Sequence, residues 1–181
     1  MAILIVLIVV VVIVAAIAIS TQRNLVNTDE LCGNALSQIG VQQTSRWDAL
    51  VNLSKMTQKY SDYEYQTLMS IVGERKNISP KSSASEVEEQ EKLLQQVSGK
   101  LFALAEAYPD LKADQVYITT MDSVNDYENK VRMSRMTYND TVTKFNRLVR
   151  QFPSMIFAGM FGFSVRDYLQ TDEAKTEVPQ M

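Results

Sequence analysis

The pattern of apolar and polar residues divides the chain at about residue 20. Residues 2–19 read AILIVLIVVVVIVAAIAI, eighteen apolar residues without a charge, glycine or proline. A helix of that length covers roughly 27 Å, close to the hydrocarbon thickness of a bilayer. A single segment in lipid has to satisfy its own backbone hydrogen bonds, so a helix is the form open to it. We therefore predict a transmembrane anchor at residues 1–20.

After the anchor the pattern becomes that of helices in a bundle. Apolar or small residues recur at three- and four-residue spacing, which marks one buried stripe of a helix. The members of this first stripe are Leu25, Thr28, Cys32, Ala35, Ile39, Ala49, Leu53, Met56, Tyr60, Tyr63 and Thr67. Gly33 and Gly40 weaken the helix but permit the close approach of a neighbour. The stripe fits either a turn near Trp47, with Asp48 as helix cap, or an unbroken helix to about Val72.

Two further helical segments follow. Residues 73–83, GERKNISPKSS, predict a loop, and Ser85 with Glu88 predicts a capping box at the start of the next helix. That helix ends at Pro109. The last stripe runs for more than five heptads, roughly 60 Å of helix, and Pro153 ends it. Its members are Ala113, Tyr117, Thr120, Val124, Tyr127, Val131, Ser134, Tyr138, Thr141, Phe145, Leu148 and Phe152.

These elements predict an all-α protein. The transmembrane helix is followed, over residues 21–153, by an antiparallel up-and-down bundle of four long helices, or three if the chain does not turn near Trp47. Residues 154–170 form a short apolar segment that lies on the membrane surface or caps the bundle. The polar, acidic residues 171–181 are predicted to be a disordered tail.

Composition narrows the possible chemistry. The chain has no histidine, one cysteine and a formal charge of -3. Histidine-based catalysis, cysteine-rich zinc sites and a basic nucleic-acid-binding surface are therefore not expected. We interpret Trp47 and Cys32 as core residues, and the acidic residues from Glu86 to Glu91 as a solvated first helical turn. No catalytic residue, metal site or cofactor is predicted, and the chain is not expected to be an enzyme.

Several blocks resemble the bacterial LemA family. They are Asn27–Glu30, Ala35–Gln42, Ala107–Ala113, Tyr138-Asn139, the run from Phe145-Asn146 to Phe152-Pro153, and Phe161–Phe163. They cover nearly the whole chain in the family's order. The departures lie in the first block, where the usual tryptophan is missing. The stretch before the second helix, which is basic and contains proline in the family, reads TSRWDAL at residues 44–50. The resemblance implies a single-pass protein of the bacterial cytoplasmic (inner) membrane with a helical bundle mostly in the cytoplasm, and it implies no catalytic residue.

Charge near the span predicts orientation. No basic side chain precedes the apolar run, whereas Arg23 follows it and Arg46 lies further on. The positive-inside bias then places the N-terminus outside and the bundle in the cytoplasm. The alternative is a cleaved signal peptide, for which Ala18-Ile19-Ser20 is a passable cleavage site.

A membrane-contact site is predicted at the end of the last helix. If the helices on either side of Pro109 form a hairpin, Glu86 to Glu91 offset Lys130 to Arg135, and three basic residues remain uncompensated. In a four-helix bundle these three arrive at the bilayer together with the aromatic residues that follow, a composition typical of an interfacial segment. The predicted contact residues are Lys144, Arg147, Arg150, Phe157, Phe161 and Phe163.

The expected function is that of a scaffold. The predicted partners are the lipid bilayer, with anionic lipid, and further copies of the same chain in a homo-oligomer. Such a protein organises the membrane or partner proteins that the sequence does not identify. The alternative is a regulatory or adaptor subunit of a membrane enzyme or protease.

Overall fold

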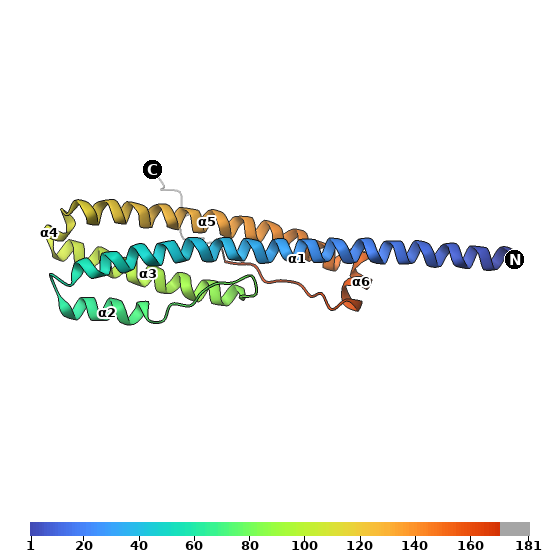
Figure 1. Ribbon diagram of the computed structural model, residues 1–181, viewed down its shortest axis with the longest axis horizontal. Coiled ribbons are helices and arrows are strands. Elements are labelled where there is room, and N and C mark those ends of the chain that lie inside the picture. The colour runs from blue at the N-terminus through green and yellow to red at the C-terminus, as the bar shows by residue number, and fades with distance from the viewer. Residues whose placement is uncertain (171–181) are drawn as a thin grey trace, which may run out of the picture.

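The computed structural model describes residues 1–170, and over this range the protein is built from six α-helices joined by loops, without a β-strand (Figure 1). The helices are α1 (Ala2–Thr57), α2 (Asp62–Val72), α3 (Ala84–Ala107), α4 (Pro109–Lys112), α5 (Gln115–Arg150) and α6 (Ser154–Met160). The predicted tail at 171–181 lies outside the described residues. The all-α prediction with a long apolar helix at the N-terminus is confirmed.

Helix α1 joins the predicted anchor to the bundle without interruption. Its 56 residues correspond to about 84 Å of helix. It is the one helix of the described chain that is long and apolar enough to cross a membrane. The apolar N-terminal part is exposed apart from the partly buried Ala18, and Leu25 is the first fully buried residue. One continuous helix thus provides both the candidate membrane span and the first helix of the bundle.

The chain does not turn near Trp47. Helix α1 continues through this residue, which is 1 % exposed and packs in the core, as the interpretation of Trp47 as a core residue predicted. The helix ends at Thr57, however, and does not reach Val72. The reason is Ser61, whose hydroxyl accepts a hydrogen bond from the Glu64 backbone N–H and starts α2 as a new helix.

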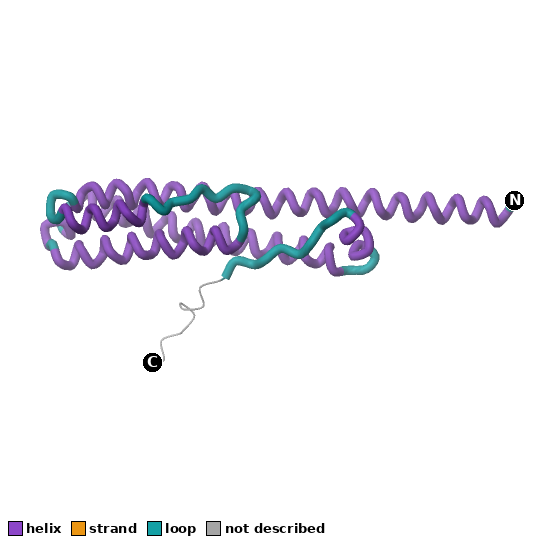
Figure 2. The backbone as a smooth tube through the Cα atoms, turned by 90° about the horizontal axis from the view of Figure 1, so that it is seen from below, coloured by secondary structure: helices purple, strands orange, loops and turns teal. Residues whose placement is uncertain are grey.

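The bundle is a four-pass, up-and-down arrangement. Helix α1 leads away from the N-terminus, α2 and the 73–83 loop lead back, α3 leads away again, and α5 returns antiparallel to α1 after the short turn of α4 (Figures 1 and 2). The second pass is not one long helix: its 11 helical residues are continued by the extended loop. In Figure 2 this loop runs along the helices.

Two glycines of α1 make room for that loop. A Cβ atom on Gly33 would lie 3.2 Å from the Cβ of Pro80. A Cβ atom on Gly40 would lie 2.6 Å from the backbone oxygen of Ile78, well inside van der Waals contact. The close approach predicted from the glycine spacing is therefore confirmed, and its partner is an extended segment.

The start of α3 differs from the prediction by two residues. The capping box consists of Ser83 and Glu86: the Ser83 hydroxyl accepts from the Glu86 N–H at 3.2 Å, and the Glu86 carboxylate accepts from the Ser83 N–H at 2.7 Å. These bonds lower the pKa of Glu86. Ser85, the predicted cap, lies inside the helix.

The core consists of two apolar clusters. The distal cluster, far from the span, gathers Trp47, Leu50, Leu53, Leu68, Leu94 and Leu101 with residues of α5. The proximal cluster gathers Leu25, Cys32, Leu36 and Ile39 of α1 with Val131, Tyr138, Val142 and Phe145 of α5. Burial in this cluster raises the pKa of the Cys32 thiol, in keeping with its predicted core position.

The α5 stripe is mostly where the heptads placed it. Tyr117, Val124, Val131, Tyr138 and Phe145 are buried. The flanks differ: Met121 and Val142 are buried in place of their predicted threonine neighbours, Tyr127 is only partly buried, and Phe152 is 79 % exposed. Phe152 lies outside because α5 already ends at Arg150.

A buried charge network joins the three long helices. Arg46 of α1, 1 % exposed, forms ion pairs with Glu91 of α3 at 2.7 Å and Glu128 of α5 at 3.0 Å. Gln43 donates to the second oxygen of Glu91 at 3.2 Å. The predicted solvated turn is therefore wrong for Glu91, because the opposing Arg46 draws its carboxylate inside.

The predicted pairing of α3 acids with α5 bases is also wrong. Besides Glu91, Glu89 pairs with Lys76 of the 73–83 loop. On the α5 side Lys130 pairs with Asp126 of its own helix at 2.7 Å, and this hydrogen bond raises the pKa of Lys130. Helix α5 packs mainly along α1, so the acids of α3 meet α1 and the loop first.

Candidate functional site at the membrane end of the bundle

Helix α5 returns to the level at which α1 leaves the apolar span. The Arg46–Glu128 pair fixes the antiparallel register of the two helices. Arg150 lies 22 residues after Glu128, and Asn24 lies 22 residues before Arg46. Because both segments are helical and rise equally per residue, the end of α5 reaches the first turns after the span. Figure 1 shows α6 beside this part of α1.

The three predicted basic residues are exposed at this end. Lys144, Arg147 and Arg150 all have open side chains, and none of them forms an ion pair with another residue in the range 1–170. Arg23, just past the span, is exposed as well. Positive side chains at the carboxyl end of a helix are favoured by its dipole, which accounts for part of this charge.

Helix α6 has one face on the bundle and one face open. Ala158 is buried in the proximal cluster together with Leu25. The open side carries large apolar residues, among them Met160, which is 74 % exposed. The others are Met155, Ile156, Phe161 and, just before α6, Phe152. The structure therefore leaves an apolar strip uncovered next to the end of the span.

The three predicted aromatic contact residues have different surroundings. Phe161 is exposed and Phe157 is half-buried. Phe163 instead packs edge-to-face on Phe145, with ring centroids 6.3 Å apart, and belongs to the margin of the proximal cluster. Residues 154–170 thus cap the bundle through Ala158 and Phe163, while the strip formed by the others stays open.

Residues 163–170 form a feature that the sequence analysis missed, and we call them the C-terminal strap. The strap runs antiparallel along α5 in an extended conformation (Figure 2). Asn146 donates to the Arg166 carbonyl at 2.9 Å and accepts from its N–H at 2.8 Å. Asn139 does the same with Leu169, at 2.8 and 2.9 Å. Each of the two side-chain amides thus donates and accepts one hydrogen bond with the strap backbone, as a residue of a neighbouring strand would.

Further contacts fix the strap at both ends. The Arg166 Nε donates to the Asp29 carboxylate of α1 at 2.7 Å, which raises the pKa of Arg166. Near the other end Tyr138 donates to the Asp167 carbonyl at 3.1 Å, and the Gln170 N–H donates to Glu88 at 2.8 Å. Leu169 is 2 % exposed in the proximal cluster. A signal was present in the sequence, since Tyr138-Asn139 and Phe145-Asn146 repeat an aromatic–asparagine pair seven residues apart.

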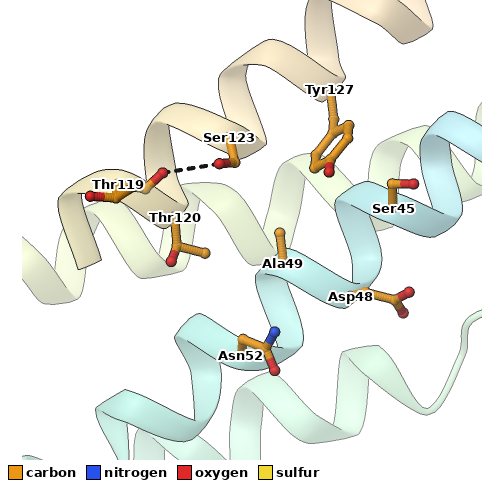
Figure 3. A pocket seen from close by; sticks show the side chains of 8 residues that line it. All are labelled: Ser45, Asp48, Ala49, Asn52, Thr119, Thr120, Ser123 and Tyr127. Carbon is orange, nitrogen blue, oxygen red and sulfur yellow. Dashed lines mark hydrogen bonds between the residues drawn. The ribbon is translucent and has the colours of Figure 1, made fainter. Parts of the chain in front are cut away.

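A polar groove lies on the outer side of the bundle between α1 and α5 (Figure 3). It is lined by Ser45, Asp48, Ala49 and Asn52 from α1 and by Thr119, Thr120, Ser123 and Tyr127 from α5, and it holds about 350 Å³. The Ser123 hydroxyl bonds to the Thr119 carbonyl, and Asp48 pairs with Arg75. Among the residues that the structure describes, no group of His, Cys, Asp and Glu has the arrangement of a metal site.

The fold and this site define a class: a helical bundle carried on a single long helix whose apolar N-terminal part is a candidate membrane anchor. The family model of the LemA family matches residues 35–181, and the chain belongs to the LemA family. It is also 28 % identical over 123 residues to Protein LemA of Metamycoplasma hominis, across 66 % of this chain and 55 % of that protein. The match thus spans about half of the relative's length. The predicted resemblance is confirmed, and LemA is a membrane-associated family that is not known as an enzyme family.

Proposed function

We propose that this protein is a membrane-anchored scaffold that self-associates and holds its bundle against the cytoplasmic surface of a bacterial inner membrane. The observation that carries the proposal is the unbroken α1, which links the apolar span rigidly to the bundle. A rigid link sets the height and tilt of the bundle above the bilayer, which suits a structural role. No catalytic step is part of this proposal.

A second membrane contact follows from the return of α5. The open strip of α6 lies near the level where α1 leaves the lipid, and burying its apolar surface in the interface is worth about 25 cal/mol per Å². Lys144, Arg147 and Arg150 are exposed at the same end. Each basic residue close to an anionic leaflet contributes about 1 kcal/mol. Together these terms favour a bundle whose end nearest the span is in contact with the membrane surface.

Self-association is supported by the surface of α1 at the membrane boundary. Ala16 and Ser20, four residues apart, help line a shallow hollow of about 500 Å³ together with Ile19, Arg23, Asn24 and Asn27. Small residues four apart let helix backbones approach closely in lipid, and polar side chains next to them bond across the interface. The partner that fits is the same face of a second copy.

The membrane contact is tested with the full chain in lipid nanodiscs. A fluorophore on Met160→Cys, with Cys32→Ala to remove the native thiol, is expected to be quenched by spin-labelled lipid. Quenching should be stronger with anionic lipid and should weaken at high salt or in Lys144→Gln/Arg147→Gln/Arg150→Gln. The control label at exposed Lys100→Cys in α3 should stay unquenched. Equal quenching at both positions, or none at Met160→Cys, contradicts the contact.

Self-association is tested separately by the size of the detergent-solubilised protein. A homo-oligomer of the chain alone is expected, and Ala16→Leu/Ser20→Leu should shift it toward the monomer. Ala15→Leu is the matched control, since Ala15 is equally exposed but does not line the hollow. A monomer in both detergent and nanodiscs contradicts the scaffold.

The adaptor role is the second candidate, and the polar groove of Figure 3 favours it. This groove lies in the distal half of the bundle, where α1 and α5 would receive a segment of a partner protein. A stable complex of fixed stoichiometry with another membrane protein, lost in Ala49→Arg/Ser123→Arg, would support the adaptor over the scaffold.

A further inference from the structure

The C-terminal strap is bound as a peptide ligand is bound. Within residues 1–170 no strand lies beside it, and side chains of α3 and α5 bond to its backbone. The four strap residues held in this way are Arg166, Asp167, Leu169 and Gln170. The Gln170 N–H donates to the Glu88 carboxylate, and the Gln170 carbonyl oxygen accepts from Arg135. The groove beneath the strap therefore has the polar groups of a peptide-binding site.

The spacing of the bonding side chains on α5 fits the spacing of the backbone groups in an extended chain. Asn139 and Asn146 are seven residues apart and hold Leu169 and Arg166, which are three apart. Seven residues of helix rise about 10.5 Å, and three residues of extended chain cover about 10 Å. Both amides can thus pair with the backbone without bending it. The match requires an extended segment that runs antiparallel to α5.

Three strap side chains add sequence preference to the backbone contacts. Phe163 packs on the Phe145 ring, Arg166 reaches Asp29 across the groove, and Leu169 fills the proximal cluster. The guanidinium of Arg166 also lies 5.9 Å from the centre of the Phe145 ring. A fitting ligand has an aromatic residue, then a basic residue three positions later, then an aliphatic residue after three more. Every copy of this chain supplies such a segment.

We propose that copies of this protein exchange their straps, so that the strap of one copy occupies the groove of its neighbour. This inference rests on the proposed self-association. The membrane holds all copies in one orientation and at one height, so that grooves and straps face each other at the same level. Exchange keeps every contact of the closed form and needs no new interface, which makes it a low-cost route to an oligomer.

The connection to the strap is long enough. Residues 151–162 separate the end of α5 from the strap, and the last of them is Gly162 with φ 77°, a conformation that glycine adopts freely. Twelve residues reach up to about 40 Å when extended, whereas packed helix axes lie about 8–10 Å apart. With α6 kept helical but released from its own bundle, the connection still spans about 27 Å, so the groove of an adjacent copy is within reach.

Charge reversal across the Arg166–Asp29 pair tests the exchange. One tagged copy carries Arg166→Asp, and a second, differently tagged copy carries Asp29→Arg. Within each copy the strap and groove then repel, whereas exchanged straps pair correctly in both directions. We expect the two copies, expressed together in the full-length form, to co-purify about fivefold better than either variant with itself. Equal recovery of mixed and like pairs would overturn the exchange.

Photo-crosslinking gives an independent readout that does not depend on affinity. A benzoylphenylalanine in place of Tyr168, whose hydroxyl lies 3.4 Å from Thr143, is introduced into one tagged copy. A crosslink to the α5 peptide of the other copy is expected, with a loss of most of it when that copy carries Asn139→Ala/Asn146→Ala. The matched control is Asn125→Ala, an exposed asparagine two heptads before Asn139.

The outcomes separate this inference from the scaffold proposal. If the tagged copies co-purify but every crosslink lies within one chain, strap exchange is wrong while self-association stands. If the copies do not co-purify at all, self-association fails, and the exchange fails with it.

Discussion

At the residue scale, two helical glycines show opposite consequences of a missing side chain. Gly40 of α1 lies against the Ile78 backbone, whereas Gly99 of α3 has nothing within 4 Å of its would-be Cβ. At Gly40 the helix propensity is low, but the missing side chain allows close packing against the 73–83 loop. Gly99 loses propensity, about 0.5–1 kcal/mol, without any packing in return.

Alanine at these two glycines should therefore have opposite effects on stability. Gly40→Ala is expected to lower the free energy of unfolding by about 1 kcal/mol or more, because the 73–83 loop has to move away from α1. Gly99→Ala is expected to raise it by about 0.5–1 kcal/mol. Thermal unfolding of the full chain in detergent measures both. A stabilising Gly40→Ala would contradict the tight contact with Ile78.

The helix cap at Ser83 gives a second prediction at this scale. Ser83→Ala is expected to cost about 0.5–2 kcal/mol, whereas Ser85→Ala, inside the helix, should cost less. Thermal unfolding of the two variants compares them directly, and equal losses would mean that the cap lies elsewhere.

The same cap predicts a pH dependence. Its hydrogen bonds lower the pKa of Glu86 in the folded state below the ordinary value of about 4.3. The stabilisation is then complete above that value and is lost as the pH falls through the lowered pKa. The difference in melting temperature between the wild type and Glu86→Gln should accordingly shrink on going from pH 7 to pH 3. A constant difference would show that the carboxylate's charge is not what the cap uses.

At the scale of elements, the buried stripe of α5 determines which substitutions the bundle tolerates. Phe145 is fully buried between α1 and the strap, so Phe145→Ala should cost about 3–5 kcal/mol. Tyr127→Ala should lower the free energy of unfolding clearly less, because Tyr127 is only partly buried. Lys130→Ala should have the smallest effect of the three, since Lys130 is exposed and its pair with Asp126 is a surface pair. Equal thermal shifts for all three would contradict the stripe.

The charge network that joins α1, α3 and α5 gives the other prediction at this scale. Arg46→Ala leaves Glu91 buried without its cation and should cost about 3–5 kcal/mol. The double variant Arg46→Met/Glu91→Met removes both charges and should recover most of that loss in thermal unfolding. If the double variant is as unstable as Arg46→Ala, apolar packing at this level does not replace the ion pair.

The sequence predicts best those features of the helices that depend on residues close together along the chain. The spacing of Tyr117, Val124, Tyr138 and Phe145 placed the buried face of α5 correctly, and Pro109 ended α3. The end of α1 was missed because a single serine, Ser61, decides it, and serines are common in loops. The cap of α3 was placed two residues late because several serines cluster at 82–85.

The strap and the Arg46 network could not be predicted for a different reason. Asn139 bonds to a residue 30 positions away, and Arg46 to one 82 positions away. No periodicity encodes such pairs, because they depend on how whole helices come together. The basic and aromatic residues of the candidate site were found from composition, whereas the packing of Phe163 on Phe145 required the fold.

At the scale of the whole molecule, charge is distributed unevenly along α4 and α5. Lys144, Arg147 and Arg150 lie near the span, and Asp110, Asp114 and Asp122 lie near the far turn. An anionic membrane surface attracts the first group and repels the second. This polarity favours a bundle that stands away from the membrane at its acidic end and contacts it at the basic end.

The same polarity bears on which side of the membrane the bundle occupies. Arg23 follows the span, and α5 brings three more basic residues back to the same surface. Positive charge is retained on the cytoplasmic side, so the N-terminus should lie outside and the bundle inside. In intact cells a membrane-impermeant maleimide should label Ala2→Cys directly and Lys100→Cys only after permeabilisation, both with Cys32→Ala. Labelling of Lys100→Cys alone in intact cells would place the bundle outside, where neither the positive-inside bias nor the anionic inner leaflet would hold it.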